Sequence, residues 1–310
     1  MQLPIFDGHN DSLGRLYPYT NKHIQEFLVR HTDGHLDLPR ARDGGLAGGF
    51  FAVYAPAQPP GTHVPLDVNL TQTGYEVPLA APLDLAYASQ MSIAMAAGLF
   101  RLETASSGEI KVVRTVEEIA RCLRTGVLAA VLHLEGADAI DPELYLLEIL
   151  YQAGLRSLGI VWSRPNPFGC GVPFRFPQSP DIGPGLTAEG RALVRACNRL
   201  GILVDVSHLN EQGFWDVAAI TSAPIVATHS NVHALCPVTR NLTDRQLDAI
   251  RESDGMVGVN FAVSFLREDG QNNADTPLSA VVRHIDYLVE RLGIDRVGFG
   301  SDFDGATIPL

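Results

Sequence analysis

Residues 3–11, LPIFDGHND, form an apolar run that ends in His-x-Asp. Such a run is typical of a β-strand, in which side chains two residues apart point to the same face. We therefore expect His9 and Asp11 to project side by side from the end of a first strand. An imidazole beside a carboxylate suits a divalent metal such as zinc, although a core histidine paired with a capping aspartate is at least as common.

Seven more apolar runs follow, with helix-forming segments between most of them. The eight runs end near residues 9, 54, 135, 162, 208, 229, 261 and 302. Continuous apolar strands between amphipathic helices indicate parallel strands that are buried on both faces. Eight such units predict an α/β fold of the (β/α)8 TIM-barrel type, although a doubly wound open sheet produces the same local pattern.

No internal repeat or linker divides the chain, so we expect one barrel catalytic domain over residues 1–310. Loop excursions are predicted near residues 12–43, 56–84 and 163–185, and the first should hold a short helix. The sequence stops at Leu310, so the last helix of the barrel is expected to be absent. Either the chain is a truncation or the barrel closes without that helix.

Composition favours a soluble, cytoplasmic protein. Apolar residues make up 46% and charged residues 19% of the 310 residues, which allows a large core. The net charge of −12 argues against nucleic acid or an anionic membrane as the main partner. Four widely spaced cysteines fit neither a disulfide framework nor a zinc finger, and we expect no signal peptide and no membrane span.

The ends of parallel barrel strands converge on one face, where active sites lie. Six residues at these ends can bind a metal or move protons: His9, Asp11, Glu135, His208, His229 and Asp302. Each alone is more often structural, but six together by chance are improbable. Three histidines and three carboxylates exceed the needs of one zinc, so two metals bridged by a carboxylate fit better. A remaining carboxylate could carry protons.

Several motifs resemble the renal (membrane) dipeptidase family of zinc peptidases, in the family's order and over nearly the whole chain. They are DGHND at 7–11, LEG at 134–136, DVSH at 205–208, ATHSN at 227–231, RN at 240–241 and GSDFDG at 300–305. The resemblance implies a microbial-type member with a (β/α)8 barrel and two zinc ions per chain. It implies these ligands: His9 and Asp11 at one zinc, His208 and His229 at the other, and Glu135 as the bridge.

The resemblance also implies roles at the substrate. Asp302 is expected to be the catalytic acid/base, and Arg240 to pair with a substrate carboxylate, which its planar guanidinium suits. The family places a histidine after the fourth strand, and Trp162 occupies that position here. Because the indole of Trp162 carries no charge, we expect Arg164 to supply the positive charge that a histidine could carry at this position. Unchanged turnover in Arg164→Ala would contradict this expectation.

These expectations combine into a zinc-dependent dipeptidase, a hydrolase in which a metal-bridging hydroxide attacks the peptide bond of a dipeptide. Asp302 then transfers the proton to the departing amine. The partner expected is a small dipeptide, with no nucleic acid and no membrane, and the sequence leaves open whether two copies form a homodimer. Two alternatives stay open: a barrel metallohydrolase acting on another amide, lactam or ester, and a zinc-binding protein without turnover.

Overall fold

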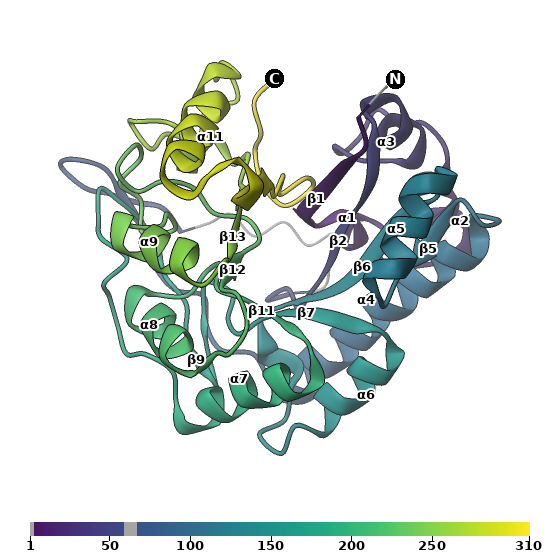
Figure 1. The fold of residues 1–310 in the computed structure, drawn as a ribbon, viewed down its shortest axis with the longest axis horizontal. Helices are drawn as coiled ribbons and strands as arrows, with labels where there is room; N and C mark the ends of the chain where they lie inside the picture. Colours follow the sequence, from purple (N-terminus) through teal and green to yellow (C-terminus); the bar gives the residue numbers. More distant parts are fainter. Residues whose placement is uncertain (1–2, 59–66) are drawn as a thin grey trace.

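The computed structural model describes residues 3–58 and 67–310, which form a ring of parallel strands surrounded by helices (Figure 1). In the order in which neighbours pair, the ring contains β2 (Leu46–Tyr54), β1 (Ile5–Asn10), β14 (Val297–Phe299), β13 (Met256–Val259), β12 (Val226–Ala227), β11 (Leu203–Asp205), β7 (Leu155–Gly159) and β6 (Leu128–Glu135). Pairing between β2 and β6 closes the ring. The predicted eight-stranded parallel barrel is confirmed.

Strand β6 shows why these sequences form the barrel wall. Its eight residues are all buried, as expected for a parallel strand covered on both faces. It pairs in register with β2 from Gly48 opposite Ala129 to Tyr54 opposite Glu135. The contact is tight at its start, since a Cβ on Gly48 would lie 2.7 Å from the carbonyl oxygen of Ala129.

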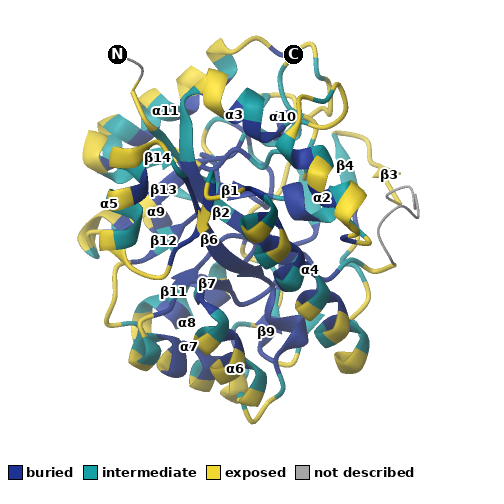
Figure 2. Ribbon diagram, turned by 90° about the vertical axis from the view of Figure 1, so that its right-hand side faces the viewer, coloured by how far each residue is buried: buried dark blue, intermediate teal, exposed yellow. Residues whose placement is uncertain are grey.

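The helices lie outside the ring, with buried faces toward the strands and exposed faces outward (Figure 2). The longer ones are α2 (Asn21–Leu28), α4 (Leu85–Ala105), α5 (Val116–Thr125), α6 (Tyr145–Ala153), α7 (Ala188–Leu200), α8 (Glu211–Ile220), α9 (Asp244–Glu252) and α11 (Ser279–Leu292). Thr115 and Thr187 cap α5 and α7, because each hydroxyl accepts a backbone N–H three residues on. No helix within the described residues is long and apolar enough to cross a membrane.

The excursions contain more structure than expected. Residues 12–43 hold α1 (Ser12–Arg15), α2 and the start of α3 (Leu38–Gly44), where one short helix was expected. The hydroxyl of Thr20 and the carboxylate of Asp37 cap α2 and α3, so local hydrogen bonds start helices in a polar stretch. The excursion at 56–84 lies partly outside the described residues.

Two excursions meet beside the barrel. Strands β3 (Asn69–Leu70) and β4 (Tyr75–Val77) come from the second excursion, and β10 (Phe174–Phe176) comes from the third. They form an antiparallel sheet in the order β10-β4-β3. Hairpin β8–β9 (Pro165–Asn166, Gly169–Cys170) completes the third excursion. The remaining elements are β5 (Ile110–Val112), which pairs with β6, α10 (Val263–Leu266), and the 3-10 helices η1 (Ala137–Ala139) and η2 (Ile294–Arg296).

Several strands end before the polar residues that the sequence places at their ends. β11 ends at Asp205, three residues before His208, and β14 ends at Phe299, three residues before Asp302. Both polar residues have a positive φ, 67° at His208 and 59° at Asp302. They therefore lie in tight turns that direct their side chains after the strand has ended. Residues 300–310, which follow β14, contain no helix in this structure.

Candidate metal centre

The five residues predicted as metal ligands meet at the end of the barrel. One carboxylate oxygen of Glu135, Oε2, lies 3.7 Å from His9 Nε2. The other, Oε1, lies 3.1 Å from His208 Nε2 and 3.5 Å from His229 Nε2. Asp11 Oδ2 lies 3.4 Å from His9 Nε2. Glu135 therefore stands between a His9–Asp11 pair and a His208–His229 pair, as a bridging ligand would.

The ligand atoms form two overlapping groups. His9, Glu135 and His229 each offer an atom within 4.8 Å of the others, and so do His9, Asp11 and Asp302. His9 belongs to both groups and joins them. Asp302, expected as the acid/base, thus lies close enough to the first pair to exchange protons with a molecule bound there.

The donor set fits a divalent metal. His9 is fully buried, and within the described residues neither of its ring nitrogens makes a hydrogen bond, although Nε2 lies within ion-pair distance of Asp11 and Glu135. A buried polar group without a partner is costly unless a ligand completes it. The Nε2 atoms of His208 and His229 lie only 3.2 Å apart, so two imidazoles and a carboxylate point into one small space. Imidazole nitrogens and carboxylate oxygens are ligands that zinc accepts.

Neighbouring residues fix which nitrogen of His229 faces the centre. Thr228 Oγ1 donates to Asp205 Oδ2 at 2.6 Å and lies 2.8 Å from His229 Nδ1. Since the hydroxyl hydrogen is already used, the threonine oxygen accepts from Nδ1–H, which leaves the lone pair on Nε2 for the centre. Ser163 Oγ lies 2.9 Å from His208 Nδ1 and occupies the corresponding position there.

Charges in this buried cluster shift one another's pKa. Burial raises the pKa of Glu135 to about 8 and that of Asp302 to about 6, with the Asp11 carboxylate adding to both. Burial lowers the pKa of His9, but Glu135 and Asp11 outweigh burial and raise it to about 10. The cluster therefore holds protons where a dication would bind, so metal binding releases them.

An amide that the sequence analysis missed holds Asp302. Asn260 is fully buried and donates from Nδ2 to Asp302 Oδ2 at 2.8 Å. Its own Oδ1 accepts from the Ala262 N–H at 2.6 Å, which fixes the orientation of the amide. Asn260 directly follows β13, so choosing polar residues at the ends of strands, as was done for the candidate ligands, would also have selected Asn260.

Arg240 is a buried cation beside the histidines. It is 3% exposed, and its two Nη atoms donate to Ser230 Oγ and to the carbonyl oxygen of His229, both at 2.9 Å. Its Nε has no partner, and the guanidinium forms no ion pair within the described part of the chain. A buried guanidinium without a carboxylate suits an anionic group delivered by a ligand.

Trp162 and Arg164 lie on the other side of His208. The Trp162 ring is partly exposed, and its centroid lies 5.9 Å from that of His208. Arg164 is fully buried, with its guanidinium carbon 4.9 Å from the Trp162 ring centroid. That Arg164 serves the substrate stays a prediction.

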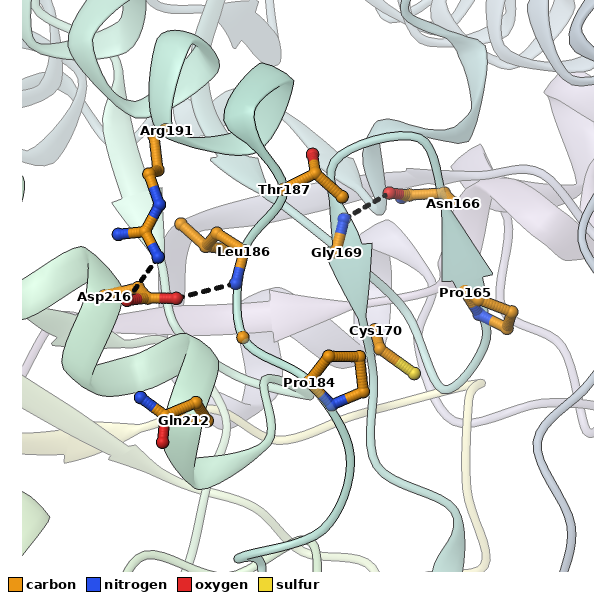
Figure 3. A pocket seen from close by; sticks show the side chains of 11 residues that line it. Pro165, Asn166, Gly169, Cys170, Pro184, Leu186, Thr187, Arg191, Gln212 and Asp216 are labelled. Atoms are coloured by element: carbon orange, nitrogen blue, oxygen red, sulfur yellow. Dashed lines mark hydrogen bonds and ion pairs between the residues drawn. The ribbon is translucent and has the colours of Figure 1, made fainter.

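A cavity of about 480 Å³ lies apart from this cluster, and none of the nine predicted site residues lines it (Figure 3). Hairpin β8–β9 and helices α7 and α8 contribute to its wall. Its charged groups satisfy one another, because Arg191 pairs with Asp216 at 2.8 Å and Asp216 also accepts from the Leu186 N–H. We assign it no ligand.

Comparisons with known proteins agree with this geometry. The family model "Membrane dipeptidase (Peptidase family M19)" matches residues 1–310. A Rhodobacter sphaeroides metallo peptidase, solved with a phosphinate mimic of the dipeptide L-Ala-D-Ala, is 51% identical with a TM-score of 0.92, covering 100% of this chain and 88% of that one. Dipeptidase AC, a metallo peptidase, is 52% identical with a TM-score of 0.92, covering 100% and 87%.

A more distant relative is dipeptidase tcpJ of Claviceps purpurea (strain 20.1), which is 27% identical over 305 residues, 96% of this chain and 65% of that protein. The family match extends over every residue that contributes to the metal centre. The chain therefore belongs to the membrane dipeptidase family, whose members are metal-dependent hydrolases.

Proposed function

We propose that this chain hydrolyses dipeptides with two zinc ions, in a single catalytic domain over residues 1–310. The observation that carries the proposal is the carboxylate of Glu135, shared between His9 on one side and the His208–His229 pair on the other. His9 and Asp11 would hold one ion, His208 and His229 the other, and Glu135 both. When bound, two such ions supply Lewis acidity and lower the pKa of a water molecule to about 7.

The protein's own residues then bind the substrate and move protons. Asp302, held through Oδ2 by Asn260, takes a proton from the attacking water and passes it to the departing amine. Arg240 pairs with the carboxylate of the substrate, because its guanidinium is buried without an acidic partner. Burial around the cluster excludes bulk water, which strengthens each of these charge interactions.

The relatives support a small dipeptide as the substrate class, since the Rhodobacter sphaeroides enzyme was solved with a mimic of one. The acidic charge of −12 supports neither nucleic acid nor anionic membrane as a partner. The four cysteines are free thiols, which fits a reducing compartment, and we propose a cytoplasmic location.

Release of amino acids from a panel of L,L- and L,D-dipeptides tests the proposal. Zinc-loaded protein should release both products, and a chelated sample should release none until zinc is restored. Metal analysis of the loaded protein should give two zinc ions per chain. Protein that holds two zinc ions but cleaves only lactams, esters or other amides, or nothing, would overturn the proposal.

A further inference from the structure

Arg164 carries a buried charge that forms no ion pair with an acid within the described residues, although its charge partly offsets the rise that burial causes in the pKa of the nearby Asp138 carboxyl. Arg164 is fully buried. Its Nη1 donates to the carbonyl oxygen of Ala55 at 3.1 Å, its Nη2 donates to the hydroxyl of Tyr54 at 2.5 Å, and its Nε has no partner. Buried charges are normally paired, and burying a guanidinium that is bound only by neutral oxygens costs free energy.

The hydroxyl of Tyr54 has a hydrogen left to donate. The oxygen of Tyr54 accepts a hydrogen bond from Arg164, so its own O–H is free to donate to another acceptor. In residues 3–58 and 67–310 this hydroxyl makes no second hydrogen bond. A phenol that accepts from a cation is polarised, which makes its remaining hydrogen a stronger donor. Burial also raises the pKa of Tyr54, so the hydroxyl keeps its proton.

This donor stands at the mouth of the barrel beside the metal centre. Tyr54 ends β2 directly opposite Glu135 in the paired register. Residues opposite each other on neighbouring parallel strands point to the same side, so Tyr54 faces the side that Glu135 faces. Its ring centroid lies 5.1 Å from that of Trp162, which in turn lies 5.9 Å from that of His208. The hydroxyl group of Tyr54 therefore lies at the end of β2, next to the candidate metal centre.

We propose that Tyr54 donates a hydrogen bond to the substrate's carbonyl oxygen as that oxygen gains negative charge, and that Arg164 strengthens the donor. The inference rests on the proposed function, because it assigns residues to the same reaction. No proton is transferred; the hydroxyl only stabilises the charge that forms when water adds to the carbonyl. The developing anion in turn offsets the charge of Arg164, which makes no ion pair within the described residues.

Tyr54→Phe tests this by removing the hydroxyl while keeping the ring. We expect kcat to fall by about a hundredfold, as when an oxyanion donor is lost, with KM within a few-fold of wild type. Bound zinc should stay at the wild-type amount. The matched control is Tyr287→Phe, which also removes a hydrogen-bonding hydroxyl, here one that donates to Asp244 Oδ1 on the outer helices at 2.7 Å. The control should leave kcat unchanged.

Affinity for a phosphinate dipeptide analogue gives a second readout, since its anionic tetrahedral centre resembles the state that the donor is proposed to stabilise. Tyr54→Phe should weaken its binding by about the same factor as it lowers kcat/KM. A purely structural role would lower Tm and leave this affinity unchanged. Arg164→Gln removes the charge and retains an amide donor, so it should lower kcat/KM and phosphinate affinity less than Tyr54→Phe does. In the double variant it should cause no loss beyond that of Tyr54→Phe alone.

Two failures can be distinguished. If wild-type protein cleaves dipeptides and Tyr54→Phe keeps its kcat and its phosphinate affinity, the inference is wrong and the proposed function stands. If Tyr54→Phe does not fold, Arg164→Gln decides, and unchanged kcat and phosphinate affinity in that variant would overturn the inference. If zinc-loaded wild-type protein cleaves no dipeptide, both are wrong.

Discussion

At the scale of single residues, Glu135 connects the two halves of the metal centre. One of its carboxylate oxygens faces His9, and the other faces His208 and His229. A neutral amide of the same shape has only one oxygen and no charge. The link between the two halves therefore depends on the charge and the two oxygens of the carboxylate rather than on the size of the side chain.

Glu135→Gln should reduce bound zinc from two ions to at most one per chain and lower dipeptide turnover by at least about a hundredfold. Elemental analysis of dialysed protein and a product-release assay measure the two effects. Glu148→Gln, at an exposed position in α6, is the control. A Glu135→Gln protein that keeps two zinc ions would show that the carboxylate does not bridge.

Asn260 acts on the pH dependence through Asp302. Burial raises the pKa of Asp302 to about 6, and the hydrogen bond from Asn260 works against this rise by favouring the ionised form. Asn260→Leu removes the bond, so the pKa of Asp302 should rise further. Because Asp302 must be ionised to accept a proton, the acid limb of kcat/KM should move to higher pH, by about one unit.

The measurement is a pH profile of kcat/KM for wild type and Asn260→Leu at saturating zinc. Asn273→Leu, at an exposed loop position, should leave the profile unchanged. An acid limb that stays in place, or moves to lower pH, in Asn260→Leu would contradict this role.

At the scale of elements, helix α11 is fastened to the barrel by a buried histidine. His284 accepts the Val232 N–H at Nδ1 and lies 3.1 Å from the Leu266 carbonyl oxygen at Nε2. This arrangement needs a neutral imidazole, and burial lowers the pKa of His284 from 6.5 to about 4. His284 therefore has a packing role, between α11, the segment that contains Val232 and the end of α10 at Leu266.

The sign of the pH effect follows from that shift. The unfolded chain takes up a proton at His284 below its ordinary pKa of 6.5, whereas the folded chain resists until about pH 4. Stability from the neutral imidazole is therefore present above pH 6.5 and lost as the pH falls toward 4. His284→Leu should have a lower free energy of unfolding than wild type at pH 7. Between pH 7 and 4.5, its free energy of unfolding should fall by about 2–3 kcal/mol less than that of wild type.

Urea unfolding of chelated wild-type and His284→Leu protein at both pH values measures this difference, because chelation removes any contribution from metal release. Equal losses of stability in the two proteins would show that the fold does not depend on a neutral His284.

At the scale of the whole molecule, the metal centre joins distant parts of the chain. His9 lies in β1 at the start of the barrel, and Asp302 follows β14, the strand near the end of the sequence that pairs with β1. Candidate ligands in β1 and β6, and after β11 and β12, lie close together. A bound ion therefore stabilises the closed ring as a whole, since an unfolded chain offers no such site.

Removing zinc with a chelator should lower Tm, and adding zinc back should restore it. At a free zinc concentration about a thousand times Kd, one site contributes about 4 kcal/mol, which corresponds to a shift of several degrees for a domain of this size. Calorimetry of loaded, chelated and reloaded protein measures the shift, and Glu135→Gln should show a smaller one. The same Tm in loaded and chelated protein would contradict this coupling.

The sequence by itself determined the barrel and the candidate ligands. Apolar runs alternate with amphipathic segments, and this pattern is local, so it can be read without knowing any contact between distant residues. The polar residues at the ends of those runs include the five candidate ligands and Asp302, which the structure brings together because parallel strands direct their carboxyl ends to one face.

Only the tertiary structure decided how these residues pair. The distance between His9 and Glu135, the amide of Asn260 on Asp302 and the guanidinium of Arg164 on Tyr54 depend on strand register and on turns with positive φ. Such contacts join residues 42 to 126 positions apart or come from loops without periodicity, so no sequence pattern encodes them locally. Only one short helix was predicted in residues 12–43, where the structure contains three, because the capping side chains of Thr20 and Asp37 start α2 and α3 in an otherwise polar stretch.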